Sequence, residues 1–448
     1  YKGLLSYSKD NKNLEQNFLA DLGDFDIDSP AIRNLSVFVY LGESTSSLNW
    51  SLYGYGRQTN QSLERFKKDD NFFVIKGVHS SHTHTTQSLL EAFSIGDVKD
   101  WNKQEQIPVP ISERKRISVL SLLSKAGVKT TIVSNQGING SSNLIAPVIF
   151  SKADEIIFGA SSGLGNVDYI NKEYDDILFN QTENKLISSL KNGPEFSLFH
   201  SYAGHGEYID FVPPKHRKKI DQNIADLSLE AIFGDSFSSS YLTKKRVDDY
   251  DTVMAYVSIN LRKAIEKTIN NRKPTILIYT SDHGESPYSG RGHDSSRYTW
   301  EMSSVPFVIY INEVAKNKYP QLYDSIRELS TSRHPKSLSS FSDLILKIFD
   351  IGTVRFGGEE VKIALCEPKA LLCSPKFRLV RKFINENGLL PNFVAEFPEN
   401  YRNLSDDIST LNSVNKELKQ KFGDDVTLCV HRANNLGRIV RGHAALGC

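Results

Sequence analysis

The sequence predicts an α/β fold in which a mostly parallel central sheet is sandwiched between helices, with a small C-terminal appendage. Short apolar runs typical of buried strands alternate along the chain with segments of helical periodicity. This alternation favours a parallel sheet covered by helices on both faces. Polar residues suited to chemistry directly follow several predicted strands, and ligands of such sheets bind beyond the carboxyl ends of the strands.

Each predicted strand is a short run of apolar residues, and each predicted helix has apolar residues three or four positions apart. The strands are expected at residues 35–41, 129–134, 155–158, 195–202, 275–280 and 306–311. The helices are expected at residues 117–126, 249–269 and 337–350. The first strand ends at Gly42 and the fourth carries His200 near its end, so we expect both to bring functional groups to one edge of the sheet.

The chain of 448 residues is long enough for one large domain and an appendage. Residues 1–34 are polar with scattered apolar positions, which favours a lead-in helix or arm. The composition changes near Gly357 and Gly358, which predicts a boundary at about residues 355–362. The expected parts are therefore a lead-in at 1–34, a main domain at 35–358 and an appendage at 359–448.

All the cysteines lie in the predicted appendage, at Cys366, Cys373, Cys429 and Cys448. None belongs to a Cys-x-x-Cys pair, which argues against a zinc ribbon. Cys366 and Cys373 are close enough in the sequence to be bridged across a loop, and free buried thiols are the alternative. The cysteines therefore do not determine the cellular compartment.

The charges of the chain nearly cancel, with a formal net charge of +1. This balance argues against a nucleic-acid partner, and short basic runs such as 215–219 are typical of solvated surface. The sequence has no apolar run of about eighteen residues and does not open with the pattern of a signal peptide. Because the chain opens on Tyr1 rather than Met, we expect it to be a fragment or a processed piece of a longer protein.

A carboxylate and an imidazole, Asp282 and His283, directly follow the predicted strand 275–280. A second carboxylate, Glu43, follows the predicted strand 35–41 in the same way. Oxygen and nitrogen ligands of this kind suit zinc, so these residues are predicted metal ligands. Taken alone, the Ser-Asp-x-Gly run could instead be ordinary turn chemistry at the start of a helix.

Hydroxyl groups precede the apolar segment 89–93, at Thr83, Thr85 and Thr86. The pattern indicates a loop leading into a helix, and the backbone N–H groups of a helix N-terminus favour a phosphate. A metal would lower the pKa of a bound hydroxyl and make it a nucleophile, whereas an N-capping threonine is the alternative. The flanking His82 and His84 are expected to be positioning or surface groups rather than metal ligands.

Further histidines follow a predicted strand or lie in glycine-rich loops, at His200, His205 and His293. Singly, each would more commonly be structural. If they converge on the metal centre, they could hold the oxygens of a phosphoryl group, a second metal, or both. One of them could also protonate a leaving alkoxide.

Together these segments resemble the phosphoethanolamine transferases of the alkaline phosphatase/sulfatase superfamily. The runs 37–44 (Val-Phe-Val-Tyr-Leu-Gly-Glu-Ser) and 51–59 (Ser-Leu-Tyr-Gly-Tyr-Gly-Arg-Gln-Thr) are similar to the opening signature of that family. The run 275–286, which contains Ser-Asp-His-Gly-Glu-Ser, is similar to its later metal motif. The resemblance covers about residues 30–352 and implies an alkaline phosphatase-like fold.

The resemblance implies one catalytic zinc, or two. The ligands of the first zinc would be Glu43, Thr85, Asp282 and His283. The groups around the phosphoryl group or a second zinc would be His200, His205 and His293, and further substrate contacts would be Asn135 and Glu285. Thr85 would be the nucleophile that carries phosphoethanolamine, with Thr83 as the second candidate.

The family further implies a ping-pong reaction. Phosphatidylethanolamine would give its head group to the threonine and release diacylglycerol, and a hydroxyl of a surface glycan or glycolipid would then accept it. Such enzymes commonly act at the membrane surface on the periplasmic side of a bacterial inner membrane, in lipopolysaccharide or capsule modification. They are commonly anchored by N-terminal helices, which are missing from this chain.

Two features depart from the family pattern. Lipid A-modifying members carry several disulfides in the catalytic domain, including one around the nucleophile. Ser81 and Glu91 stand near those places here and the catalytic region has no cysteine, so a lipid A acceptor is not expected. The run 430–435 (Val-His-Arg-Ala-Asn-Asn) is faintly similar to the opening of a glycerophosphodiester phosphodiesterase-like barrel. An ordinary basic segment that closes the appendage is the favoured alternative.

Other functions remain as alternatives. A formylglycine-type sulfatase needs Cys or Ser in a C/S-x-P-x-R context, which the run 82–85 lacks. A glycerol-phosphate transferase, or a phosphatase or phosphodiesterase of the same superfamily, is closer, but the run 51–55 favours phosphoethanolamine. An inactive scaffold that keeps the fold is opposed by the presence of every expected metal ligand.

Overall fold

The computed structural model describes residues 25–28, 32–80, 82–96, 101–102, 107–108, 116–136, 149–159, 174–188, 193–217, 241–288, 292–293, 300–331, 336–356, 359–361, 416 and 420. The cysteines, the run 430–435 and Ser81 lie outside these residues, as does most of the predicted lead-in. Within the described part of the chain, no helix combines the length and the apolarity needed to span a membrane.

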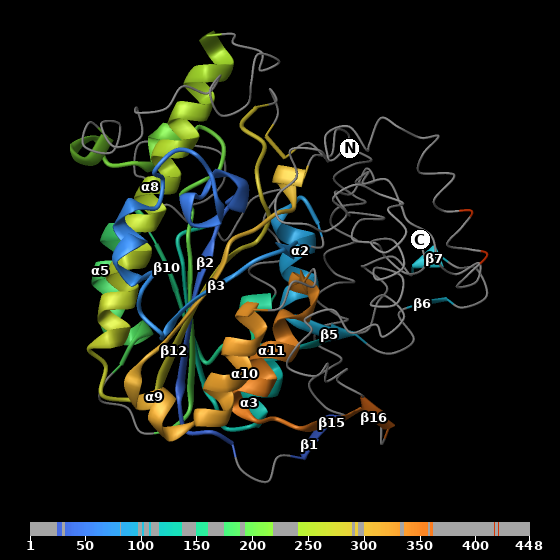
Figure 1. Cartoon of the computed structure of the whole chain (residues 1–448). Coiled ribbons are helices and arrows are strands. Elements are labelled where there is room, and N and C mark those ends of the chain that lie inside the picture. The colour runs from blue at the N-terminus through green and yellow to red at the C-terminus, as the bar shows by residue number, and fades with distance from the viewer. Residues whose placement is uncertain are drawn as a thin grey trace.

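The core of the molecule is a seven-stranded sheet with the order β10-β9-β11-β2-β12-β13-β3 (Figure 1). Its strands, in chain order, are β2 (Ser36–Gly42), β3 (Phe72–Ile75), β9 (Lys129–Ser134), β10 (Glu155–Phe158), β11 (Glu195–His200), β12 (Thr275–Ser281) and β13 (Phe307–Ile311). Neighbouring strands from β10 to β12 are parallel, whereas β13 is antiparallel to both β12 and β3. The mostly parallel sheet predicted from the sequence is therefore confirmed.

Helices cover both faces of this sheet (Figure 1). One face carries α5 (Asp175–Leu186) and α8 (Tyr241–Ile269). The helices that contribute to the apolar layer on the opposite face are α2 (Thr85–Ala92), α3 (Val119–Lys125), α9 (Glu313–Lys318), α10 (Pro320–Thr331) and α11 (Phe341–Phe349). The sandwich arrangement is that of an α/β fold.

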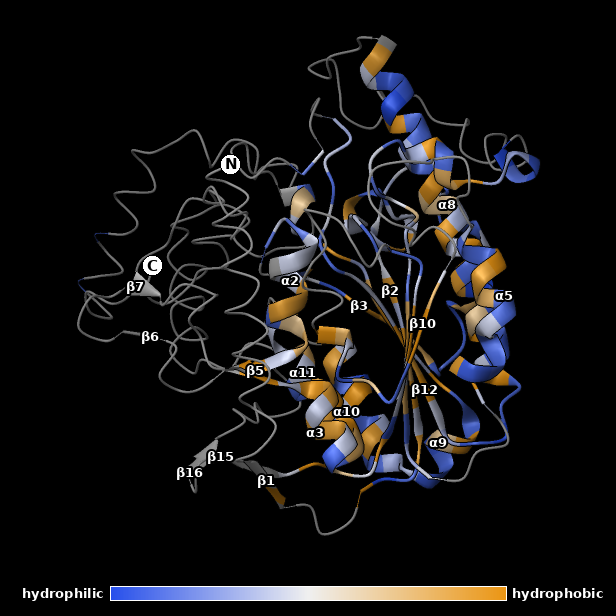
Figure 2. Ribbon diagram, turned by 180° about the vertical axis from the view of Figure 1, so that it is seen from behind, coloured by the Kyte–Doolittle hydropathy of each residue, from blue (hydrophilic) through white to orange (hydrophobic). Residues whose placement is uncertain are grey.

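Side-chain alternation along the central strands explains why both faces are covered. On β2, Val37 and Val39 pack into one apolar layer, while Phe38 and Tyr40 pack into the other, and all four are fully buried. Because successive side chains of a strand point to opposite faces, a continuous apolar run requires burial on both sides. Figure 2 shows hydrophobic residues concentrated in the central strands and in the helices beside them.

Some predicted boundaries shift for local reasons. The predicted helix 117–126 begins at Val119, because residues 116–118 form a short strand and the Ser118 hydroxyl caps the helix by accepting from Leu120 N. The predicted helix 337–350 becomes α11 only at Phe341, after a short strand and a 3₁₀ turn. It ends at Phe349, because Asp350 follows with a left-handed φ of 66°.

Shorter elements surround the core. Paired short strands are β1 (Phe25–Asp28) with β15 (Thr353–Phe356) and β16 (Glu359–Val361), β4 (Val78–His79) with β14 (Lys336–Ser337), β5 (Ser94–Gly96) with β8 (Arg116–Ser118), and β6 (Trp101–Asn102) with β7 (Ile107–Pro108). The 3₁₀ helices are η1 (Ser47–Asn49), η2 (Ser51–Tyr53), η3 (Gln61–Phe66), η7 (Tyr208–Phe211), η9 (Trp300–Met302) and η10 (Leu338–Ser340). Strand β1 belongs to the predicted lead-in and pairs with a segment at the predicted boundary, while the domain limits themselves stay predictions.

Candidate metal centre

The carboxyl ends of the central parallel strands meet at one edge of the sheet. Strand register pairs Gly42 with Ser281 and Leu41 with His200, so the residues that follow β2 and β12 emerge side by side. Glu43 follows β2, and Asp282 with His283 follows β12. The fourth predicted group, Thr85, is the first residue of α2.

These four predicted residues lie together. His283 Nε2 is 3.6 Å from Glu43 Oε1 and 3.4 Å from Asp282 Oδ2. The Thr85 hydroxyl oxygen is 3.4 Å from Glu43 Oε2 and 3.4 Å from His283 Nε2. All four side chains are buried, and we call them the first cluster. Two carboxylates, an imidazole and a hydroxyl thus face a common point from three separate elements.

The charges of the first cluster are poorly compensated by its own residues. Burial raises the pKa of Glu43. Burial, and then the charge of Glu43, raise the pKa of Asp282 to about 6, whereas burial lowers the pKa of His283. Asp282 Oδ2 is buried and has no hydrogen-bond partner. A buried carboxylate oxygen without a donor is costly, and a divalent cation bound by these oxygens and the imidazole would satisfy it.

Local hydrogen bonds hold the ligands of the first cluster in place. His283 Nδ1 lies 2.8 Å from the Gly284 carbonyl oxygen, so that nitrogen carries the proton and Nε2 keeps its lone pair for a metal. Asp282 Oδ1 accepts from the backbone N–H groups of Ser44 at 3.0 Å and His283 at 2.7 Å. These contacts leave Asp282 Oδ2 as the oxygen directed at the cluster.

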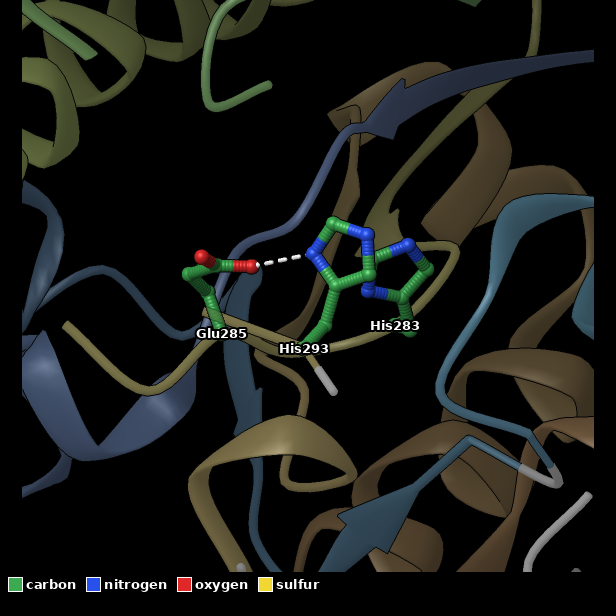
Figure 3. A group of neighbouring side chains, drawn as sticks. All are labelled: His283, Glu285 and His293. Atoms are coloured by element: carbon green, nitrogen blue, oxygen red, sulfur yellow. Dashed lines mark hydrogen bonds and ion pairs between the residues drawn. The ribbon is translucent and has the colours of Figure 1, made fainter. Parts of the chain in front are cut away.

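A second cluster adjoins the first and shares His283 (Figure 3). His293 Nδ1 lies 2.7 Å from Glu285 Oε2, and the rings of His283 and His293 are 4.7 Å apart. Burial opposes the charge on His293, but the hydrogen bond and charge of Glu285, with the other carboxylates, raise the pKa of His293 to about 9. This cluster could hold a second metal, or its imidazolium could hold anionic oxygen.

Tyr208, in η7, supports the second cluster. Its hydroxyl donates to Glu285 Oε1 at 2.5 Å, while Glu285 Oε2 faces His293. Both oxygens of this carboxylate are therefore held, which fixes the position of the His293 ring. His84, next to Thr85, extends the group, since its ring lies 5.3 Å from that of His293.

Two of the predicted site histidines, His200 and His205, belong to neither cluster among the described residues. His200 is fully buried, with its ring 5.5 Å from that of Phe150 and its Nδ1 3.2 Å from the Ser134 hydroxyl. Burial lowers the pKa of His200 to about 3, so it is neutral there. His205 is partly buried, with its ring 5.3 Å from that of Tyr202. Their predicted contacts with a phosphoryl group stay predictions.

Asn135 is turned toward the start of α5. Its side-chain amide donates to Asp175 Oδ1 at 2.8 Å, and Asp175 also accepts from the backbone of Tyr202 and Ala203. The residue thus joins the ends of β9 and β11 to α5, and a substrate contact for it stays a prediction. Thr83 and His82 are fully buried, with His82 Nε2 3.9 Å from Glu91 Oε1.

Sequence reasoning missed two residues that hold the clusters. Gln136 donates to Glu43, and its place after the predicted strand 129–134 is the signal that could have identified it. Tyr208 gave no such signal, because it lies in a 3₁₀ turn and contacts Glu285 only through the tertiary fold.

Gly204 allows the loop after β11 to pack directly on the backbone of Glu43. Its φ is 123°, and a Cβ at this position would lie 2.1 Å from the Glu43 carbonyl oxygen. We expect Gly204→Ala to lower the free energy of unfolding by about 3 kcal/mol and to displace Glu43, which weakens metal binding. Urea denaturation and zinc titration would measure the two effects.

Gly193→Ala is the matched control for this prediction. Gly193 has a φ of 107°, but no atom lies within 4 Å of its would-be Cβ. Gly193→Ala should therefore lower the free energy of unfolding by about 1 kcal/mol, through backbone strain alone, and leave zinc affinity unchanged. Equal losses of stability in the two variants would contradict the close contact at Gly204.

Comparison with known proteins gave a family match and several relatives. The family model described as Sulfatase matches residues 36–350. Phosphoethanolamine transferase EptA of Helicobacter pylori is 26% identical over 295 residues, which cover 65% of this chain and 50% of that protein. Phosphoethanolamine transferase EptC of Escherichia coli is 24% identical over 381 residues, which cover 83% of this chain and 58% of that protein. The chain thus spans between half and three fifths of the length of these relatives.

Solved structures share the fold. The crystal structure of the C-terminal periplasmic domain of EptC from Escherichia coli, in complex with Zn, superposes with a TM-score of 0.60 at 20% identity, covering 75% of this chain and 86% of that one. The soluble domain of lipooligosaccharide phosphoethanolamine transferase A from Neisseria meningitidis superposes with a TM-score of 0.55 at 20% identity, covering 79% and 98%. At 20% identity, these superpositions are evidence for the fold alone.

Proposed function

Because the chain belongs to the sulfatase family, we propose that it is a zinc-dependent phosphoethanolamine transferase. One observation carries the proposal: a hydroxyl, Thr85, lies 3.4 Å from both Glu43 and His283 inside a buried set of metal-type ligands. The relatives named phosphoethanolamine transferases bear out the resemblance seen in the sequence and favour this chemistry over other reactions of the family.

Glu43, Thr85, Asp282 and His283 would hold the catalytic zinc, and the zinc complex of the EptC domain supports this choice of metal. When bound, zinc would lower the pKa of the Thr85 hydroxyl and neutralise charge on the phosphoryl group. Glu43 keeps the threonine side chain oriented, since its Oε2 accepts a hydrogen bond from the Thr85 hydroxyl. The second cluster offers a place for a second zinc.

The proposed reaction has two half-reactions that balance. Thr85 Oγ1 forms a bond to the phosphorus of phosphatidylethanolamine, the bond from phosphorus to the glycerol oxygen breaks, and the threonine proton ends on the released diacylglycerol. An acceptor hydroxyl then forms a bond to the same phosphorus, the bond to Thr85 breaks, and the acceptor proton returns to Thr85. Both steps develop negative charge on the phosphoryl oxygens, which His293 is proposed to contact.

Further contacts with the phosphoryl group are proposed for His200 and His205, and contacts with the substrate for Asn135 and Glu285. The raised pKa of His293 keeps it cationic near neutral pH in the zinc-free protein, which suits it to an anionic group. Glu285 would act through His293, which it holds at 2.7 Å.

The partners are proposed from the relatives. The donor is phosphatidylethanolamine at a membrane surface, and the acceptor is a hydroxyl of a glycan or glycolipid. The superposed EptC structure is a periplasmic domain, which supports a place on the periplasmic side of a bacterial inner membrane. Because the chain spans only part of its relatives, the activity of the whole protein is included in the proposal.

Intact-mass spectrometry after incubation with zinc and phosphatidylethanolamine vesicles would test the proposal. We expect a mass increase equal to one phosphoethanolamine group, together with released diacylglycerol. Labelling from phosphatidylglycerol vesicles instead would indicate the alternative glycerol-phosphate transferase. Diacylglycerol with free phosphoethanolamine, and no lasting adduct, would indicate a phosphodiesterase. No adduct and no product from either lipid would refute the proposal.

A further inference from the structure

Gln136 is a buried side chain that contacts a predicted metal ligand directly. It lies two residues beyond the end of β9 and is 1% exposed. Its side-chain nitrogen donates to Glu43 Oε2 at 2.5 Å and to the Ser201 carbonyl oxygen at 3.0 Å. One amide group thus connects the residues that follow β9, β11 and β2.

The orientation of this amide is determined by its partners. Both contacts of the side-chain nitrogen are to acceptors, a carboxylate and a backbone carbonyl, so the two hydrogens of the NH₂ group are both used. A flipped amide would place its oxygen against two other oxygens. The Gln136 backbone is held as well, since its N–H donates to the Ser134 hydroxyl at 3.2 Å.

As a result, each oxygen of the Glu43 carboxylate accepts a hydrogen bond. Its Oε1 accepts from the Ser44 hydroxyl at 2.7 Å, and its Oε2 accepts from Gln136. Donors on both oxygens fix the plane of the carboxylate group, which could otherwise rotate about its last side-chain bond. His283 Nε2 faces Oε1 and the Thr85 hydroxyl faces Oε2, so that plane sets the geometry of the first cluster.

We propose that Gln136 is a positioning residue for the metal centre, which holds the Glu43 carboxylate in the orientation that binds zinc. This inference rests on the proposed zinc site. Partners of metal ligands orient the ligand, and their loss commonly lowers metal affinity by about 10–100-fold. The competing explanation is that Gln136 only ties the ends of β9 and β11 together, in which case its loss would lower stability without a specific effect on the metal.

The zinc affinity of Gln136→Met separates these explanations. Methionine has a similar length but no donor. We expect this variant to bind zinc at least about tenfold more weakly than the unmodified chain, in competition with a chromophoric chelator. Urea denaturation of the zinc-free proteins would report stability separately. If the methionine variant does not fold, Gln136→Asn, whose shorter side chain cannot reach Glu43, is expected to show a loss in the same direction.

Asn312→Ala is the matched control. Asn312 is also a buried amide, and it donates to the Lys273 carbonyl oxygen at 2.7 Å at the opposite end of β12. It should lower stability and leave zinc affinity unchanged. Unchanged zinc affinity in Gln136→Met, or an equal loss in Asn312→Ala, would overturn the inference. If the unmodified chain binds no zinc, the proposed zinc site itself fails, and the inference with it.

Discussion

Thr85→Ala is expected to abolish the covalent adduct and to lower transfer by about 10³-fold or more, as loss of a nucleophile does in other enzymes. The Thr85 hydroxyl lies 3.4 Å from both Glu43 and His283, which is the position expected of the nucleophile. Thr85, at the start of α2, is 8% exposed, whereas the other three residues of the first cluster are fully buried. Alanine there removes one hydroxyl and little packing, and stability should change by about 1 kcal/mol at most.

Two variants make this prediction specific. Thr85→Ser keeps the hydroxyl and should retain a measurable adduct. Thr83→Ala should also form the adduct, because Thr83, which is fully buried two residues away, is not the proposed nucleophile. Intact mass after incubation with phosphatidylethanolamine measures all of them, and peptide mapping locates the modified residue. A normal adduct on Thr85→Ala that is absent from Thr83→Ala would move the nucleophile to Thr83.

Much of the central sheet was predictable because most of its strands are buried on both faces. The runs 129–134 and 155–158 coincide with β9 and β10, and the run 275–280 is β12 less its last residue. A continuous apolar run needs no tertiary information to be recognised. Strand β3 was missed although it is as long as the predicted β10 and its four residues are apolar; its antiparallel pairing with β13 gives no local signal.

The first cluster was predictable for a related reason, whereas the residues that hydrogen-bond to the cluster residues could not be predicted. The parallel strands fix where their ends meet, so Glu43 and Asp282 could be placed together from their positions in the chain alone. The contacts of Gln136 with Glu43, and of Tyr208 with Glu285, join residues 93 and 77 positions apart. Such pairs depend on loop paths, which follow no periodic pattern. For the same reason, the burial of His200 against Phe150 could not be foreseen from the sequence.

Asp282→Asn is expected to have opposite effects on metal binding and on the stability of the zinc-free protein. Asparagine keeps the oxygen that accepts from Ser44 and His283, but it replaces Asp282 Oδ2 with an amide nitrogen that cannot bind zinc. Zinc affinity should therefore fall by about 100-fold or more, since a charged ligand is lost from a four-ligand site. Transfer activity should fall with it at limiting zinc.

The gain in stability follows from the pKa of Asp282. Burial, and then the charge of Glu43, raise that pKa to about 6, compared with about 3.9 for an unfolded aspartate. Between about pH 4 and pH 6, Asp282 is protonated in the folded zinc-free protein but ionised in the unfolded chain. The free energy of unfolding therefore falls as the pH rises from about 4 to about 6. At neutral pH the full penalty is present, so Asp282→Asn should be more stable by the order of 2 kcal/mol in the presence of a chelator.

Asp251→Asn is the control that separates this effect from burial in general. Burial also raises the pKa of Asp251 to about 6, but its carboxylate lies 2.9 Å from Arg57 and belongs to neither cluster. Asparagine would remove one of the two carboxylates that pair with the Arg57 guanidinium, because Asp248 also lies 2.7 Å from it, and we expect unchanged zinc affinity. Urea denaturation at pH 7.5, with zinc and with chelator, measures both variants. Destabilisation of zinc-free Asp282→Asn, or undiminished zinc binding by it, would show that this carboxylate does not serve the metal.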